Sequence, residues 1–332
     1  MVYWPAGIEA LGPEGRSVMG TSKGFFLAVT VTSATLLLLG IGTLGAKPDK
    51  PNPHKPVPAT DIVLVPKITL QGAQSRAARG GQRRTGAATG FLGEPCSGRK
   101  YAIVIGISEY PGYVNDLDYA DDDADDVTQV LDVVYGFDSI ITLKDAYGTR
   151  SAIMNAIATV GEKAVSGDEV VFFFSGHGMT GTAADGDAER TDEAIVINPP
   201  LGSGPFVDYE WIWDGELRTA FSGFATSRII FIFDVCNAGG MDDLQEPGRV
   251  LLMASGERSD AYEGPEWGNG EFTYYLAQGI ATGVANMHDY AEIGVLSNPI
   301  LVTAEEAFDY AKANCEADRP VIGDGFLNDL LP

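Results

Sequence analysis

The sequence predicts an α/β fold for residues 100–332, with a mostly parallel sheet covered by helices on both faces. Two observations lead to this prediction. Short apolar runs rich in β-branched and aromatic residues recur along this region, as expected for strands that are buried on both faces. Amphipathic stretches of helical periodicity lie between them, and a repeated strand–helix order implies right-handed crossovers and parallel pairing.

The predicted strands are continuous apolar runs, at residues 101–107, 139–143, 169–174, 228–233 and 250–255. The predicted helices start with residues 119–136, where Ala120, Ala124, Val127, Leu131 and Val134 share one face. Further helices are expected over residues 149–165, 210–222, 270–282 and 303–315. Because ligands of such folds bind beyond the carboxyl ends of the strands, that edge of the sheet is where chemistry is expected.

The chain before this region divides into three parts. Residues 1–23 form a lead in which Met19 offers an alternative start, and residues 24–46 are 23 consecutive uncharged residues. Such a run suits either a transmembrane anchor or a cleaved signal peptide, so a membrane-anchored or secreted, extracytoplasmic protein is expected. Residues 47–99 are rich in Pro, Gly and Arg and predict a flexible linker or prosegment, in which only "DIVLVPKITL" is apolar.

Charge changes sharply near residue 100. Residues 47–100 hold ten basic and three acidic residues, whereas residues 101–332 hold ten basic and 41 acidic ones, a net charge of −31. A domain this acidic repels phosphate backbones, which argues against nucleic-acid binding. It suits cationic substrates or divalent metals, although solubility alone explains most of these carboxylates.

Two of the predicted strands end in residues that can carry chemistry. Residues 169–174 run into Ser175, Gly176, His177 and Gly178, and residues 228–233 run into Asp234, Val235 and Cys236. If the two strands are neighbours, His177 and Cys236 meet at one edge, where an imidazole can take the proton of a thiol. The N–H groups of Gly178 and Cys236 are candidates to stabilise an oxyanion. The pattern predicts acyl transfer, and a structural histidine beside a packing cysteine is the alternative.

These motifs resemble a known family. "VVFFFSGHG", followed about sixty residues later by "IIFIFDVCNAGG", is similar to the caspase and metacaspase superfamily of cysteine peptidases, in particular its prokaryotic metacaspase-like branch. "YAIVIGISEYPG", "LDYADDDADDV", "DGDAERTDEAIVI" and "GNGEFTYYLAQGI" extend the resemblance over residues 100–330. It implies a three-layer α/β/α sandwich with His177 as general base and acid and Cys236 as nucleophile. Relatives often have His-Ser-Gly where this chain has Asn237-Ala238-Gly239.

The same resemblance implies a substrate class. Metacaspases prefer Arg or Lys before the scissile bond, and the residues that match their pocket are Asp123, Ser175 and Asp234. The acidity of the domain independently favours a cationic side chain over an acidic one. Structural carboxylates are the alternative for Asp123 and Asp234. The basic linker contains Arg76, Arg79, Arg83 and Arg84, so self-processing there is expected beside the alternative of a plain tether.

The chemistry needs no cofactor, but the resemblance also suggests Ca²⁺. Asp192, Asp214 and Asp243 match the aspartates that metacaspases use, and carboxylate oxygens suit this ion. Gly215 stands where relatives have a second aspartate, and solvated loop acids are the alternative.

The sequence therefore predicts a monomeric cysteine endopeptidase with protein or peptide substrates. A legumain-like peptidase of the same fold with other specificity is the first alternative. A non-catalytic caspase-like scaffold or binding module and a metal-binding surface protein are the others.

Overall fold

A computed structural model describes residues 59–65, 67–69, 86–112, 115–183, 191–203, 209–288 and 302–332. The predicted lead, the apolar segment 24–46 and the linker arginines lie outside the described residues. Within the described ranges, no helix is both long and apolar enough to cross a membrane.

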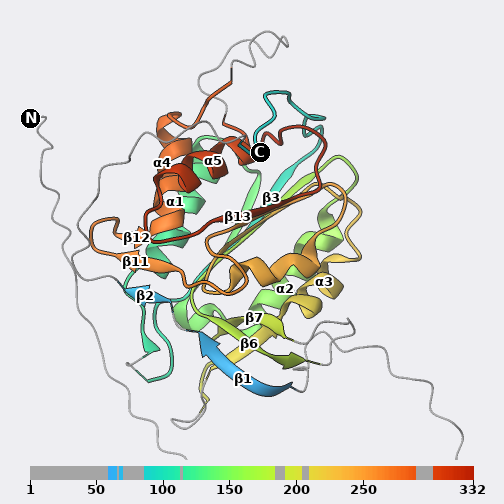
Figure 1. Cartoon of the computed structure of the whole chain (residues 1–332). Coiled ribbons are helices and arrows are strands. Elements are labelled where there is room, and N and C mark those ends of the chain that lie inside the picture. The colour runs from blue at the N-terminus through green and yellow to red at the C-terminus, as the bar shows by residue number, and fades with distance from the viewer. Residues whose placement is uncertain are drawn as a thin grey trace, which may run out of the picture. The chain divides into compact units, whose positions relative to one another are not determined.

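A six-stranded sheet forms the centre of the domain (Figure 1). In spatial order its strands are β13 (Val321–Asp324), β10 (Arg249–Met253), β9 (Ile229–Asp234), β5 (Glu169–Ser175), β3 (Lys100–Gly106) and β4 (Ser139–Lys144). All neighbouring pairs are parallel except β10 with β13. This arrangement confirms the predicted α/β class and mainly parallel sheet. The sequence prediction missed β13, a four-residue strand with only two strongly apolar residues.

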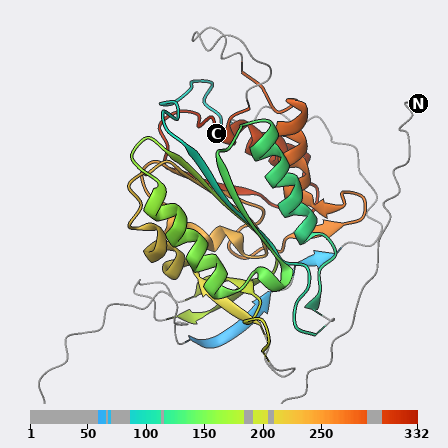
Figure 2. The same ribbon diagram turned by 180° about the vertical axis from the view of Figure 1, so that it is seen from behind.

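Helices cover both faces of this sheet (Figures 1 and 2). On one face lie α1 (Ala120–Val133), α4 (Glu271–Thr282) and α5 (Ala304–Asn314), and on the other lie α2 (Arg150–Lys163) and α3 (Asp214–Phe221). Each face encloses its own apolar core. Capping fixes the helix starts, since Thr149 accepts the Ala152 N–H before α2 and Thr303 accepts the Glu306 N–H before α5. Two short 3₁₀ helices complete the list, η2 (Asp145–Tyr147) and η3 (Ala238–Leu244).

Two smaller sheets complete the domain. The first is antiparallel, in the order β1 (Ala59–Val65), β6 (Gly178–Ala183), β7 (Asp192–Ile197) and β8 (Glu210–Trp213). The second has the order β12 (Asn269–Gly270), β11 (Tyr262–Gly264) and β2 (Ile68–Thr69). The sequence did not predict these strands: residues 210–213, expected to begin a helix, form β8, and the helix begins only at Asp214. β6 is built from Gly, Met, Thr and Ala, and the second sheet has strands of only two or three residues.

The predicted flexible linker over residues 47–99 needs correction in two places. Its apolar stretch forms β1 and β2, which are held because they complete the edges of the two smaller sheets. Residues 86–99 also pack on the domain, where Ala87 and Ala88 donate their N–H groups to the Asp309 carboxylate. The folded part of the chain therefore extends on the amino side of residue 100.

Phe172 is a suitable probe of the core between the sheet and α2. Its ring centroid lies 5.6 Å from that of Phe221, 6.1 Å from that of Phe231 and 5.9 Å from that of Phe233. We expect Phe172→Ala to lower the free energy of unfolding by about 3–5 kcal/mol, because it leaves a buried cavity. Urea denaturation measures this loss. The matched control is Phe91→Ala, a side chain that is 66% exposed. An equal effect of both replacements would contradict the assigned packing.

Candidate active site

The two strand ends singled out in the sequence are neighbours. β5 and β9 pair in parallel, with Ser175 opposite Asp234, so His177 and Cys236 follow at the same edge. The Gly176 N–H donates to the Asp234 carbonyl at 3.3 Å. A Cβ on Gly178 would lie 2.3 Å from the Cys236 carbonyl oxygen, which no real side chain tolerates. Gly178 is therefore a glycine because its backbone packs directly on the backbone of Cys236.

His177 is held in one tautomer. Its Nε2 lies 2.7 Å from the Asn115 carbonyl oxygen, which can only accept, so Nε2 carries the proton and Nδ1 is an acceptor. The Nδ1 atom accepts the N–H of Lys67 at 3.1 Å. The ring of Tyr110 stacks on the imidazole at 4.7 Å, and its hydroxyl accepts the His177 N–H. Burial lowers the pKa of His177 to about 4, although the Asn115 carbonyl acts to raise it. The imidazole is therefore neutral near pH 7, and its Nδ1 lone pair is occupied by the N–H of Lys67.

The turn that carries Cys236 is rigid. Asn237 adopts a left-handed conformation with φ 60°, which asparagine tolerates better than most residues. Ser255 bridges the turn, since its hydroxyl accepts the Ala238 N–H at 3.0 Å and donates to the Val235 carbonyl at 2.9 Å. The cysteine is thereby fixed between the end of β9 and the start of η3.

The Cys236 thiol is buried and protonated. Only 1% of the residue is exposed, and Sγ accepts the Ala261 N–H at 3.1 Å. Burial raises the pKa of the thiol to about 12, although the Ala261 N–H acts to lower it. The pair Cys236 and His177 is thus neutral as it stands, and the thiol would have to lose its proton before it could act as a nucleophile.

Beside this pair, the three predicted pocket residues surround one cation. The Nζ atom of Lys67 lies 2.8 Å from Asp234 Oδ1, 3.4 Å from Asp123 Oδ2 and 3.2 Å from the Ser175 hydroxyl. None of the lysine and aspartate side chains is exposed. The structure therefore brings Asp123, Ser175 and Asp234 together, and the cation among them comes from the predicted linker.

The start of α4 orients both carboxylates. Asp234 Oδ2 accepts the N–H of Thr273 at 3.0 Å and its hydroxyl at 2.6 Å. Asp123 accepts the Gly270 N–H at 2.9 Å on Oδ1 and the Ser175 hydroxyl at 2.6 Å on Oδ2. The unpaired N–H groups at a helix start favour negative charge, so the start of α4 binds both carboxylates and holds them in place.

Gly270 makes room for the cation. A Cβ there would lie 2.5 Å from Asp234 Oδ2 and 2.6 Å from Lys67 Nζ. The sequence analysis missed Gly270 and Thr273, as well as Lys67. A glycine and a threonine around the first residue of a helix were the available signal, but such residues are common at helix starts for other reasons.

Charge balance in the pocket depends on the cation. Burial lowers the pKa of Lys67, but the charges of Asp234, Asp123 and Glu263 outweigh it, so the pKa is raised and the ammonium stays charged. Burial raises the pKa of Asp123 to about 7, against the lowering effect of Lys67. Glu263 is a further acid that the sequence analysis did not select, and it is fully buried. With no cation present, like charges and burial would drive a proton onto this cluster.

The predicted calcium ligands are not assembled. Asp214 Oδ1 accepts the Gly215 N–H, and Asp243 forms an ion pair with Arg218 at 2.5 Å. In the part of the chain that the structure describes, the three metal-ligating side chains that lie close enough to share an ion are Glu271, Cys315 and Asp318, not Asp192, Asp214 and Asp243.

The carboxylates of Glu271 and Asp318 accept hydrogen bonds from backbone N–H groups. Glu271 accepts the N–H groups of Glu316, Ala317 and Asp318, and Asp318 accepts those of Tyr262 and Phe272. They brace the loop after α5 against the start of α4.

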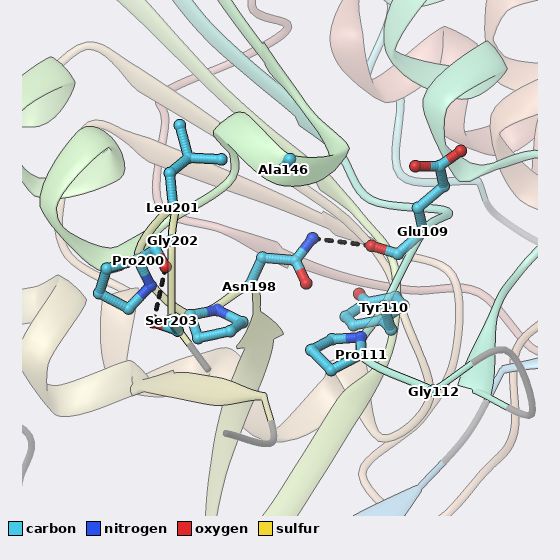
Figure 3. Close-up of a pocket in the computed structure, with 11 residues that line it drawn as sticks. Glu109, Tyr110, Pro111, Gly112, Ala146, Asn198, Pro200, Leu201, Gly202 and Ser203 are labelled. Carbon is cyan, nitrogen blue, oxygen red and sulfur yellow. Dashed lines mark hydrogen bonds between the residues drawn. The ribbon is translucent and has the colours of Figure 1, made fainter. Parts of the chain in front are cut away.

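A separate open hollow of about 380 Å³ has Tyr110 in its lining (Figure 3). Its walls include Glu109, Pro111 and the loop 198–203, and the Asn198 side chain donates to the Glu109 carbonyl at 2.8 Å. Tyr110 is the residue that this hollow shares with the surroundings of His177.

Together, a buried thiol, a neutral imidazole and an acidic pocket at the carboxyl edge of a parallel sheet define a caspase-like α/β protein with the parts of a cysteine hydrolase. The family model of the caspase domain matches residues 99–300, and the chain belongs to this family of cysteine peptidases. This finding confirms the resemblance that the motifs indicated.

Relatives with curated names are distant. Metacaspase-1 of Lodderomyces elongisporus is 32% identical over 162 residues, 45% of this chain and 35% of that protein. Metacaspase-1 of Saccharomyces cerevisiae is 29% identical over 158 residues, with the same coverages, and metacaspase-1B of Aspergillus fumigatus is 30% identical over 163 residues, 46% and 39%. The match thus spans little more than a third of the length of these relatives.

Among solved structures, protein GSU0716 from Geobacter sulfurreducens superposes with a TM-score of 0.50. The superposition covers 70% of this chain and 95% of that one at 17% sequence identity. At this identity the likeness concerns the fold alone.

The state of the Cys236 thiol predicts its reactivity. Because its pKa is raised to about 12, we expect iodoacetamide to modify it at pH 8 at least about tenfold more slowly than the partly exposed Cys96. The rate should climb about tenfold per pH unit from 7 to 9, since the thiolate fraction is still far from saturation. Peptide mass spectrometry of labelled protein measures both rates, and unfolding in denaturant should abolish the difference. A plateau below pH 9 would contradict the protonated thiol.

Proposed function

We propose that this protein is a cysteine endopeptidase that cleaves peptide bonds after Arg or Lys. The observation that carries the proposal is the ammonium of Lys67 between Asp234 and Asp123, because a pocket that holds a lysine side chain at 2.8 Å and 3.4 Å can hold that of a substrate. The names of the metacaspase relatives support a peptidase of this branch.

In the proposed first half of the reaction, the Cys236 thiol gives its proton to His177 Nδ1. The sulfur attacks the carbonyl carbon of the residue whose side chain fills the pocket. In this proposal the negative oxygen that forms would accept hydrogen bonds from the N–H groups of Gly178 and Cys236. The C–N bond then breaks, the leaving amine takes the proton from Nδ1, and a thioester remains.

In the second half, water attacks the thioester while Nδ1 accepts one of its protons. The C–S bond breaks, the proton returns to the sulfur, and the acid product leaves. The Nε2–H bond to the Asn115 carbonyl keeps the imidazole in the same tautomer at the end of the cycle. Each group returns to its starting state, so these residues need no cofactor to complete the cycle.

The export signal and the linker cleavage predicted from the sequence remain parts of this proposal. Residues 24–46 would place the domain outside the cytoplasm, and Arg76, Arg79, Arg83 and Arg84 match the proposed specificity. A cut in this basic stretch would separate the domain from its apolar segment.

Hydrolysis of fluorogenic peptides ending in Arg, Lys, Asp or Asn tests the function. Lys67 fills the pocket, so the full chain carrying Lys67→Ala is used, with and without Ca²⁺. We expect turnover of Arg and Lys peptides that is lost when Cys236→Ala is added. Turnover after Asn or Asp would favour the legumain-like alternative. Equal silence with and without Cys236 would favour a non-catalytic module.

The missing Cβ of Gly270 offers a test of the pocket. In the Lys67→Ala chain we expect Gly270→Ala to lower kcat/KM for Arg and Lys peptides, because the new methyl group takes the place of the cation. The expected loss of transition-state stabilisation is about 1–3 kcal/mol. The loss should appear mainly in KM. Gly223→Ala is the matched control, since a Cβ at Gly223 meets nothing within 4 Å. If Gly270→Ala left the KM of these peptides unchanged, the pocket would be misassigned.

A further inference from the structure

The segment around Lys67 is paired on both sides of the candidate site. Before Lys67, β1 runs antiparallel to β6, with Leu64 opposite Met179 and Val65 opposite Gly178. After Lys67, β2 runs parallel to β11, with Ile68 opposite Tyr262 and Thr69 opposite Glu263. In Figure 1 the two blue strands lie beside these partners. The chain therefore enters the site along β6, which begins next to His177, and leaves it along β11.

A substrate has to run the other way. The residue whose side chain fills the pocket must present its carbonyl carbon to Cys236, and the amide of the following residue must reach His177 Nδ1 to take a proton. The chain after the pocket residue thus passes the imidazole. The observed amide on Nδ1, at 3.1 Å, is that of Lys67 itself, and the chain after Lys67 leaves along β11.

We propose that residues 59–69 are a built-in inhibitor that lies in the substrate cleft in reverse and so resists cleavage at Lys67. This inference rests on the proposed function, since it assigns the regulation of the same site. Lys67 occupies the pocket with its ammonium and occupies His177 Nδ1 with its amide. The base cannot take the thiol proton while its lone pair accepts this amide.

Because it binds in reverse, the segment can block the site without being cleaved by it. A segment bound in the substrate direction would be cut after Lys67 and released by the enzyme it blocks. The reversed segment offers the bond before Lys67 at the imidazole, while the pocket side chain belongs to the residue after that bond. No peptide bond of the segment therefore has both its acyl side in the pocket and its amide at His177.

Activation then requires the segment to leave as a whole. The predicted cuts at Arg76, Arg79, Arg83 and Arg84 lie on its carboxyl side. Such a cut would leave the segment held only by strand pairing and by the buried ion pair, from which it can dissociate.

Lys67→Ala in the full chain tests the inhibitor. We expect kcat/KM for a peptidyl-Arg substrate to rise at least about tenfold over the wild-type chain, because affinity is scaled by the fraction of molecules whose cleft is open. Cys236 should be alkylated by iodoacetamide faster by a similar factor. Val65→Pro, which weakens the β1 pairing and leaves the pocket charges alone, should act in the same direction. Lys163→Ala, at an exposed helix end, is the matched control.

Intact-mass analysis of the wild-type chain during incubation tests the direction. We expect no product cut between Lys67 and Ile68. Cleavage at that bond, or loss of activity in Lys67→Ala, would show a forward-bound processing site and overturn the reversed inhibitor. Unchanged alkylation of Cys236 in both variants would overturn it as well. Faster alkylation with no turnover by either the wild-type chain or the variants would instead retain the inhibitor and reject the proposed peptidase function.

Discussion

The buried ammonium of Lys67 between Asp234 and Asp123 is the interaction on which the rest of the site depends. Removing three charges from water costs several kcal/mol per ion, and such a cluster is tolerated only when each charge has partners. Here the partners come from every side: Ser175 from β5, Thr273 and Gly270 from the start of α4, and Asp234 from the end of β9. The pocket is therefore shaped for an occupant with one positive charge.

The main sheet supplies the rigidity that this arrangement needs. β5 and β9 are fully buried, and their pairing fixes Ser175 opposite Asp234 before either chain turns out of the sheet. Three residues after Ser175, Gly178 packs on the backbone of Cys236, which is two residues after Asp234. Because so few residues separate the regular strands from the thiol and the imidazole, there is little freedom for the pair to drift apart.

The sequence was informative where chemistry follows a strong strand. The apolar runs before Ser175 and Asp234 identified the central strands, and the polar residues after them identified the pair and the pocket. The sequence did not predict contacts of residues that lie in weak local patterns. Lys67 is one of four lysines in the predicted linker, and its partners lie 56 to 167 residues away in the chain. β6 contains two glycines and β2 has only two residues, so neither gives a clear strand signal, and both are stabilised by tertiary pairing. Likewise, the match of Asp192, Asp214 and Asp243 to a metal site could not foresee that Asp243 pairs with Arg218.

The pairing of β1 with β6 has one more consequence. β8 and β1 are the outer strands of the smaller antiparallel sheet, and β6 lies inside it only because β1 covers it. A molecule that loses β1 gains an open row of backbone N–H and C=O groups beginning at Gly178, next to the thiol. Such an edge recruits extended polypeptide from any source. Opening the cleft would thus also expose a strand edge that can pair with unfolded chains or loops. The opened form would also be more prone to self-association.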